Sequence, residues 1–185
     1  MRPKELFISI FAVLFRYRSF WQKLKDSMPS DTSGLLRDYA VPVIALAQLS
    51  KFPLIGVPRP AMFFSIATFL IDVGVLYLLI GGAVYLVDPE RPEKIQSDML
   101  TVFSYSMTPV WISELFYFTG AWSWLFAVSA ILYTVVISRY GFNLLFEPHT
   151  ADSRNALRNI TFFQVAVNCA VFFLEKALMR LFNFI

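Results

Sequence analysis

The sequence is poor in the residues from which soluble proteins build polar sites. Charged residues make up 16% of the 185 residues, against about a quarter in a typical soluble domain. There is one cysteine, Cys169, and one histidine, His149. A disulfide framework, a zinc site and bis-histidine haem ligation each need more of these residues, so all three are excluded. We expect no bound metal and no other cofactor.

Apolar residues are abundant instead, at 57% of the chain with a mean hydropathy of +0.60, which is typical of an integral membrane protein. The longest apolar stretch, residues 101–146, is broken only by Thr119 and Gly120. It is too long for one helical crossing of about 20 residues and therefore predicts a helical hairpin in lipid. Four amphipathic rings near its turn are expected at the membrane surface: Trp111, Tyr117, Trp122 and Trp124.

Further apolar runs extend this pattern, and we predict an all-α integral membrane protein with five transmembrane helices in a bundle. The first run is the weakest, because Gln48 and Lys51 limit its apolar core and Pro42 interrupts its hydrogen bonding. In the second, Gly81 and Gly82 permit a bend or a close helix approach. The predicted spans are residues 36–55, 61–87, 99–118, 122–146 and 160–184.

Residues 1–30 precede this membrane domain, which we assign to residues 31–185. Between Glu5 and Asp26, apolar residues recur at three- and four-residue steps and predict an amphipathic interfacial helix. The run is too short to span a bilayer, so the helix either lies on the membrane or packs on a partner protein. Its basic start imitates a signal peptide but lacks a small-residue cleavage site, so we expect it to be retained.

The basic residues predict the orientation and the simplest partner. With a cytoplasmic N-terminus, twelve of the sixteen Lys and Arg residues lie on the cytoplasmic side, which places the C-terminus outside. The net charge of +3 comes from residues that border apolar runs, so membrane lipids are expected as partners and nucleic acid is not. Arg139 is otherwise an ordinary positive-inside anchor. The candidate headgroup contacts are Arg16, Arg18, Lys23, Lys25 and Arg139.

Asp72, near the middle of the second span, is the sharpest candidate for an intramembrane polar site. An uncompensated charge at that depth costs several kcal/mol, and Ser65 and Thr68 lie on the same helix face. This polar stripe must face the interior of the bundle. It is either a proton or substrate site or a structural hydrogen bond, for which Tyr105 or Tyr133 could be the partner.

Three more charged residues lie in apolar runs: Glu114, Glu175 and Lys176. They could pair across helices or hydrate an external vestibule, but we expect them to snorkel to the membrane surface. The sequence contains no nucleotide-binding loop, nucleophile elbow or HExxH motif, so we expect neither catalytic residues nor an enzymatic activity.

Several short patterns, in this order, resemble the bacterial branch of the Yip family, which comprises five-span membrane proteins named for interaction with Ypt/Rab GTPases. They are an upstream set of Trp21, Leu36, Tyr39, Ala40, Pro42 and Ile44, then Tyr105, Ser106 and Pro109 in SYSMTP, Tyr133, and Tyr140 and Gly141 in RYGFNLLF. The resemblance implies a helical bundle in the bacterial cytoplasmic membrane with its N-terminus in the cytoplasm. The chain lacks the long N-terminal region of the eukaryotic members, so a Rab-type GTPase is not expected as a partner.

Two hypotheses for function follow. The first is a non-enzymatic Yip-like protein that binds lipids and other membrane proteins or itself, for example as an accessory subunit of a larger complex. The alternative is a small channel or transporter that uses Asp72.

Overall fold

The computed structural model describes residues 3–27, 34–87, 92–146 and 151–182. Every secondary-structure element in these ranges is a helix, which confirms the all-α class for the described part of the chain. His149 and the boundary predicted between residues 30 and 31 lie outside the described residues.

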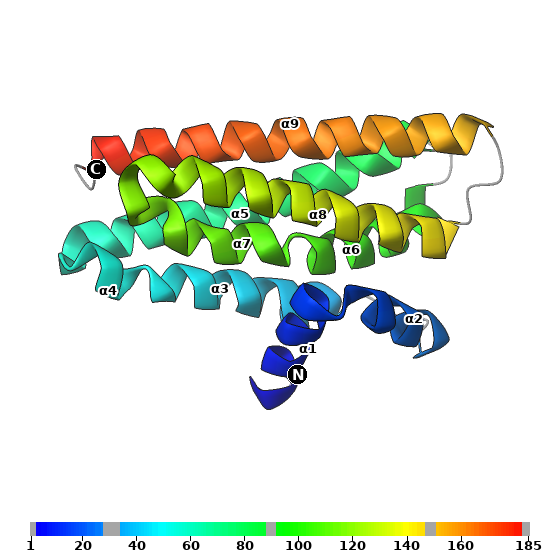
Figure 1. Cartoon of the computed structure of the whole chain (residues 1–185), viewed down its shortest axis with the longest axis horizontal. Helices are drawn as coiled ribbons and strands as arrows, with labels where there is room; N and C mark the ends of the chain where they lie inside the picture. Colours follow the sequence, from blue (N-terminus) through cyan, green and yellow to red (C-terminus); the bar gives the residue numbers. More distant parts are fainter. Residues whose placement is uncertain (1–2, 28–33, 88–91, 147–150, 183–185) are drawn as a thin grey trace.

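The long helices lie side by side and form an elongated bundle (Figure 1). Helix α5 contacts α9, α6 and α3, and α8 contacts α6, α7 and α9. The bundle helices are α5 (Pro58–Val87), α6 (Pro92–Ser106), α7 (Thr108–Ser113), α8 (Ser123–Phe146) and α9 (Ala151–Leu181).

Three helical stretches of the described chain are long and apolar enough to cross a membrane. By length and composition these stretches suit a membrane protein, whereas the count of five crossings stays a prediction. The stretches are Pro58–Val87, Ile95–Phe146 and Arg154–Leu181.

The 52-residue stretch Ile95–Phe146 doubles back on itself, as the hairpin prediction requires. Its turn lies within η2 (Glu114–Trp122), where Gly120 has a φ of 63° in the left-handed region that favours glycine. Trp122 and Trp124 near the turn are exposed. Trp111 and Tyr117 are buried, so their prediction as surface rings was wrong, because both side chains pack inside the bundle.

The first predicted span is not one long helix but three short pieces. Around Pro42 the chain forms a π-helical turn, η1 (Leu36–Ala40), in which the N–H of Val41 donates to the carbonyl of Leu36. This wide turn accommodates the N–H that proline lacks. The other two pieces are α3 (Val41–Ser50) and α4 (Phe52–Ile55).

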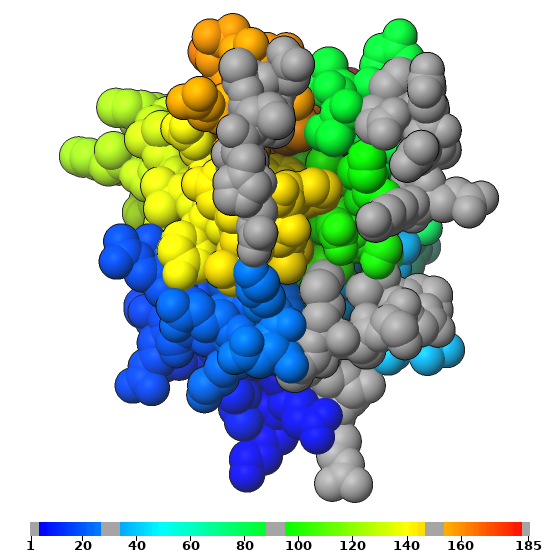
Figure 2. All heavy atoms as spheres, turned by 90° about the vertical axis from the view of Figure 1, so that its right-hand side faces the viewer, coloured from blue at the N-terminus to red at the C-terminus, as the bar shows by residue number. Residues whose placement is uncertain are grey.

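The amphipathic N-terminal segment forms two helices, α1 (Pro3–Phe15) and α2 (Tyr17–Ser27), and not the single helix predicted. Helix α1 projects sideways from the bundle, and α2 follows its flank (Figure 1). Seen end-on, the spheres of α2 lie directly against those of α8 (Figure 2). Trp21 is fully buried there, and its ring would lie 2.7 Å from a Cβ added at Gly141. The apolar stripe therefore packs on the bundle of its own chain.

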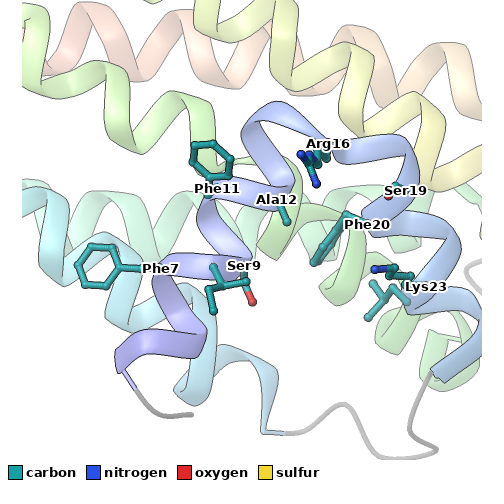
Figure 3. A pocket seen from close by; sticks show the side chains of 10 residues that line it. Phe7, Ser9, Phe11, Ala12, Arg16, Ser19, Phe20 and Lys23 are labelled. Atoms are coloured by element: carbon teal, nitrogen blue, oxygen red, sulfur yellow. The ribbon is translucent and has the colours of Figure 1, made fainter.

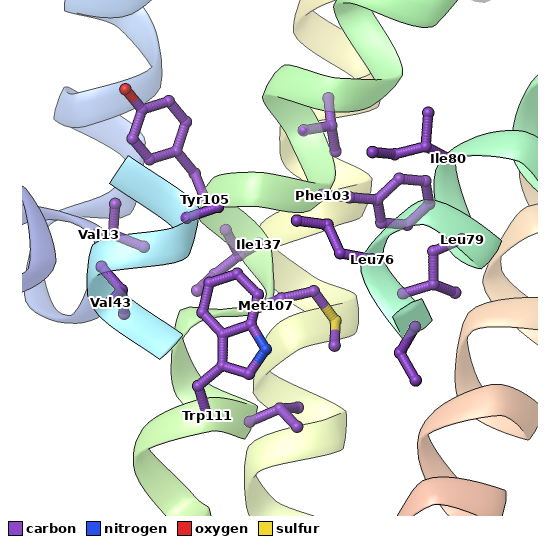
Figure 4. Close-up of a cluster of buried hydrophobic side chains, with 14 of the residues drawn as sticks. Val13, Val43, Leu76, Leu79, Ile80, Phe103, Tyr105, Met107, Trp111 and Ile137 are labelled. Carbon is purple, nitrogen blue, oxygen red and sulfur yellow. The ribbon is translucent and has the colours of Figure 1, made fainter. Parts of the chain in front are cut away.

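The largest apolar cluster fills the centre of the bundle (Figure 4). It is built mainly from α3, α5, α6, α7 and α8, and α1, α2, η1 and α9 also contribute buried side chains. Here α5 and α9 approach so closely that a Cβ added at Gly82 would lie 2.4 Å from the ring of Phe163. The prediction of a close approach is thus correct for Gly82, whereas Gly81 has open space beside it. The labelled members are Val13, Val43, Leu76, Leu79, Ile80, Phe103, Tyr105, Met107, Trp111 and Ile137.

Candidate functional site

Four ionisable side chains from four segments of the bundle meet inside it. Lys51 follows the end of α3, Asp72 lies on α5, Glu114 begins η2 and Glu175 lies on α9. Each is at most 2% exposed, and they are the only buried Asp, Glu, Lys or Arg side chains among the described residues. Water is excluded from this position, so the four groups must compensate one another. We call them the Lys51 cluster.

The ammonium group of Lys51 is the positive centre of the cluster. Its Nζ lies 2.7 Å from Oε2 of Glu114 and 3.8 Å from Oε1 of Glu175. The ring centroid of Phe64 lies 5.4 Å from the same nitrogen, a distance at which an aromatic face attracts a cation. The lysine is therefore held by charge on one side and by an aromatic ring on another.

Gln48, one helical turn before Lys51, connects the carboxylates to the polar stripe of α5. Its Nε2 donates to Oδ2 of Asp72 at 2.6 Å and to Oε2 of Glu114 at 2.9 Å. Its Oε1 accepts from Thr68 at 2.5 Å, and its backbone carbonyl accepts from Ser65 at 3.1 Å. With all these polar groups bonded, the amide is fixed in one orientation between α3, α5 and η2.

The charges of the Lys51 cluster do not balance if every group is ionised. Oxygens of Asp72, Glu114 and Glu175 all lie within 4.8 Å of one another, and a single ammonium faces them. Like charges this close in a dry interior repel strongly. Two further positive charges are needed for neutrality, and these are protons or a bound cation.

Two features favour protons over a metal ion. Three carboxylates are a plausible ligand set, but the Lys51 ammonium already lies against Glu114 and would repel a metal ion there. Glu114 Oε1 and Glu175 Oε1 are also buried without a hydrogen-bond partner, and oxygens of the three carboxyls lie within 4.8 Å of one another, so a proton on one carboxyl gives it a donor for a neighbouring oxygen. A hydrogen bond between two carboxyls forms only when one of them carries a proton.

Aromatic side chains cover the cluster toward the end of the bundle where the hairpin turns. The ring of Phe64 contacts Phe118 and Phe182 edge-on, at centroid distances of 6.1 and 6.2 Å. Tyr117 contacts Phe172 at 5.1 Å. On the flank, an apolar groove of about 350 Å³ between α3 and α5 reaches Gln48. The aromatic rings thus cover the cluster toward the end of the bundle, and the groove brings the surface to Gln48 on its flank.

The predicted stripe of Ser65, Thr68 and Asp72 is found as expected, on one face of α5 and directed into the bundle. The partner of Asp72 is different from the prediction, since it is Gln48 and not Tyr105 or Tyr133.

The two tyrosines lie elsewhere because their rings pack with the N-terminal helices. Tyr105 contacts the rings of Phe20, Trp21 and Tyr39, and the Tyr133 hydroxyl donates to the backbone carbonyl of Leu14. They support the docking of α1 and α2 and do not belong to the Lys51 cluster.

The candidate headgroup contacts are all exposed. Four of them lie where α1 meets α2 or along α2, and one lies on the outer face of α8. They are Arg16, Arg18, Lys23, Lys25 and Arg139.

Sequence reasoning missed the central role of Gln48 and Lys51, and the prediction that Glu114 and Glu175 snorkel was wrong. Only Lys176 is partly exposed, and it donates to the backbone carbonyl of Tyr117. A usable signal was present, because apolar runs of the sequence carry single charges and charges inside a membrane pair with one another.

The chain matches no family model, no curated protein and no solved structure. The resemblance to the Yip family therefore stays a prediction. What the protein does must be inferred from the chemistry of the Lys51 cluster and of its surface.

Proposed function

We propose that this chain is a small proton channel or proton carrier of a membrane, and that the Lys51 cluster is its proton-binding site. The observation that carries the proposal is the burial of three adjacent carboxyl groups with one ammonium. Ionisable residues inside membranes commonly form proton relays. Asp72 alone would make a poor relay, whereas three carboxyls whose oxygens lie within 4.8 Å of one another can pass a proton from one to the next.

The residues around the carboxyls have distinct roles in this proposal. Lys51 holds one negative charge on Glu114, so that protons bind to the remaining carboxyls. Gln48 keeps Asp72 and Glu114 within reach of each other by donating to both. The Phe64 ring layer closes the site toward the hairpin end, and displacing it would open a path for water.

Proton flux into liposomes tests the proposal directly. The purified protein is reconstituted with a pH-sensitive dye inside the vesicles, and a potassium diffusion potential is applied. We expect the wild type to acidify the lumen and Asp72→Asn or Glu175→Gln to lower the rate by roughly the 10²-fold or more that follows from removing a proton-transfer group. Flux no faster than in empty vesicles would refute the proposal.

A matched control separates loss of a proton carrier from loss of an interhelical contact. Gln164 is buried on α9 and accepts a hydrogen bond from Ser138 at 2.8 Å, but it carries no charge. We expect Gln164→Leu to keep the wild-type rate. Infrared difference spectra after a pH jump should show a carboxyl C=O band that Asp72→Asn or Glu175→Gln removes and Gln164→Leu leaves. Equal loss of flux in all three variants would favour a purely structural cluster.

A second candidate function is the one that the Yip resemblance implies, binding of other membrane proteins in a bacterial cytoplasmic membrane. Helix α1 supports it by projecting from the bundle with exposed apolar side chains. Crosslinking in native membranes tests it, and a chain that is always recovered as a monomer without a partner would count against it. Reporter tags at the two ends test the proposed orientation, since tags in the same compartment would exclude it. The exposed residues are Phe7, Ile8, Phe11 and Phe15.

A further inference from the structure

The bend between α1 and α2 encloses a groove of about 710 Å³ (Figure 3). Its composition changes along its length. Phe7 and Phe11 lie at the α1 end, Arg16 lies at the bend, and Phe20 lies between Arg16 and Lys23 toward the α2 end. A surface that is apolar at one end and carries two basic side chains toward the other matches an elongated ligand with an apolar tail and an anionic headgroup.

The two walls of the groove are fixed by the bundle. Val13 of α1 and Trp21 of α2 are fully buried, so each helix is held against the core on the side facing away from the groove. The bend is closed by backbone hydrogen bonds on both sides of Arg16, whose N–H donates to Ala12 and whose carbonyl accepts from Phe20. A groove that exists before the ligand arrives saves the cost of ordering its walls on binding.

We propose that this groove binds one anionic phospholipid of the surrounding bilayer. The guanidinium of Arg16 and the ammonium of Lys23 attract the phosphate at the α2 end of the groove, and an acyl chain lies on the rings of Phe7 and Phe11 at the α1 end. Guanidinium groups bind phosphate oxygens in a bidentate manner, and lysine adds a point charge. The choice of an anionic lipid follows from these two cations.

The charge of the whole segment argues against a second copy of this chain as the occupant. Residues 1–27 contain six Lys and Arg residues and two Asp and Glu residues. Two such segments would repel each other, whereas anionic headgroups are attracted by each basic residue near the surface. A lipid phosphate is attracted by the net positive charge of the segment, and the bilayer supplies the apolar environment for the lipid tail.

Lipid binding to two double variants of equal charge tests the site. Arg16→Gln/Lys23→Gln removes both cations that line the groove. Arg18→Gln/Lys25→Gln removes two basic residues of the same segment that do not line it. The full-length protein is titrated with phosphatidylglycerol or phosphatidylcholine in detergent micelles, and bound lipid is counted by native mass spectrometry.

We expect the wild type to prefer phosphatidylglycerol, and the groove variant to lose that preference by roughly tenfold or more, as the charge of two basic residues implies. The control variant should keep most of it. Phe11→Ala should weaken binding of both lipids equally, since it shortens the apolar wall alone. Equal losses in the two double variants, equal binding of the two lipids by the wild type, or a dimer that excludes lipid from the groove would each overturn the proposal. Because the readout is lipid binding, these results do not depend on whether the Lys51 cluster moves protons.

Discussion

Both halves of helix α5 bury side chains, but the first half buries polar and charged groups whereas the second half buries apolar groups alone. The first half carries Ser65, Thr68 and Asp72 into the Lys51 cluster, and the second half carries Leu76 and Leu79 into the apolar core of Figure 4. In a bilayer the hydrophobic effect hardly drives helices together, since lipid is as apolar as leucine. One half therefore depends on matched charges and the other on matched shapes. A substitution that removes a charge should therefore destabilise the first half, and a substitution that adds side-chain volume should destabilise the second half.

The largest effect is expected from Lys51→Met, which nearly conserves volume and removes the only ammonium of the cluster. Three carboxyls then remain with no cation, and breaking a buried pair in this way costs about 3–5 kcal/mol. The measurement is the free energy of unfolding in mixed micelles. The double variant Lys51→Met/Glu114→Gln removes both partners of the 2.7 Å contact and should recover part of the loss. A double variant less stable than Lys51→Met would contradict the pairing.

A smaller effect is expected in the apolar half from Gly82→Val, which adds volume and no charge. The new Cβ would lie 2.4 Å from the Phe163 ring, and overpacking of this kind costs about 1–3 kcal/mol. Gly81→Val is the matched control, because nothing lies within 4 Å of a Cβ at that position. The same unfolding assay should separate the two variants, and equal losses would show that the α5–α9 approach is looser than described.

The smallest effect is expected from a neutral hydrogen bond between α8 and α9, at the level of the second half of α5. Ser138 of α8 donates to Oε1 of Gln164 of α9 at 2.8 Å. Hydrogen bonds between membrane helices contribute about 0.6 kcal/mol on average, so Ser138→Ala should cost about that much. Ser129→Ala on the exposed face of the same helix serves as the control. A loss as large as that of Lys51→Met would mean that polarity, and not charge, stabilises the first half.

The sequence predicts how the site residues of one helix are arranged, but not which residues of other helices they meet. The facing of Asp72 could be predicted because helical spacing places Ser65 and Thr68 on its side whatever surrounds the helix. Its partner could not, because Gln48 and Asp72 belong to different helices whose relative rotation depends on the packing of the whole bundle. For the same reason Glu114 and Glu175 were expected at the membrane surface, because each apolar run by itself contains no partner that would stabilise a buried carboxylate.

The bend at Arg16 is another feature that the sequence predicts only in part. The periodicity between Glu5 and Asp26 correctly indicates helical structure with a buried stripe. It continues through Arg16, however, and therefore does not indicate the break between the two helices. The break lets Val13 and Trp21 both reach the bundle, where Gly141 leaves room for the indole ring. Such a fit depends on α8, which lies more than a hundred residues further along the chain.

By itself, then, the sequence determined the properties that add up along the chain: apolar length, helical periodicity, the hairpin turn and the scarcity of charge. Tertiary structure alone decided which of the scarce charges meet. A charge buried in one helix is unfavourable until a partner on another helix compensates it, and partners are chosen by the packing of the helices in space. The Lys51 cluster is therefore a property of the bundle and of none of its helices taken singly.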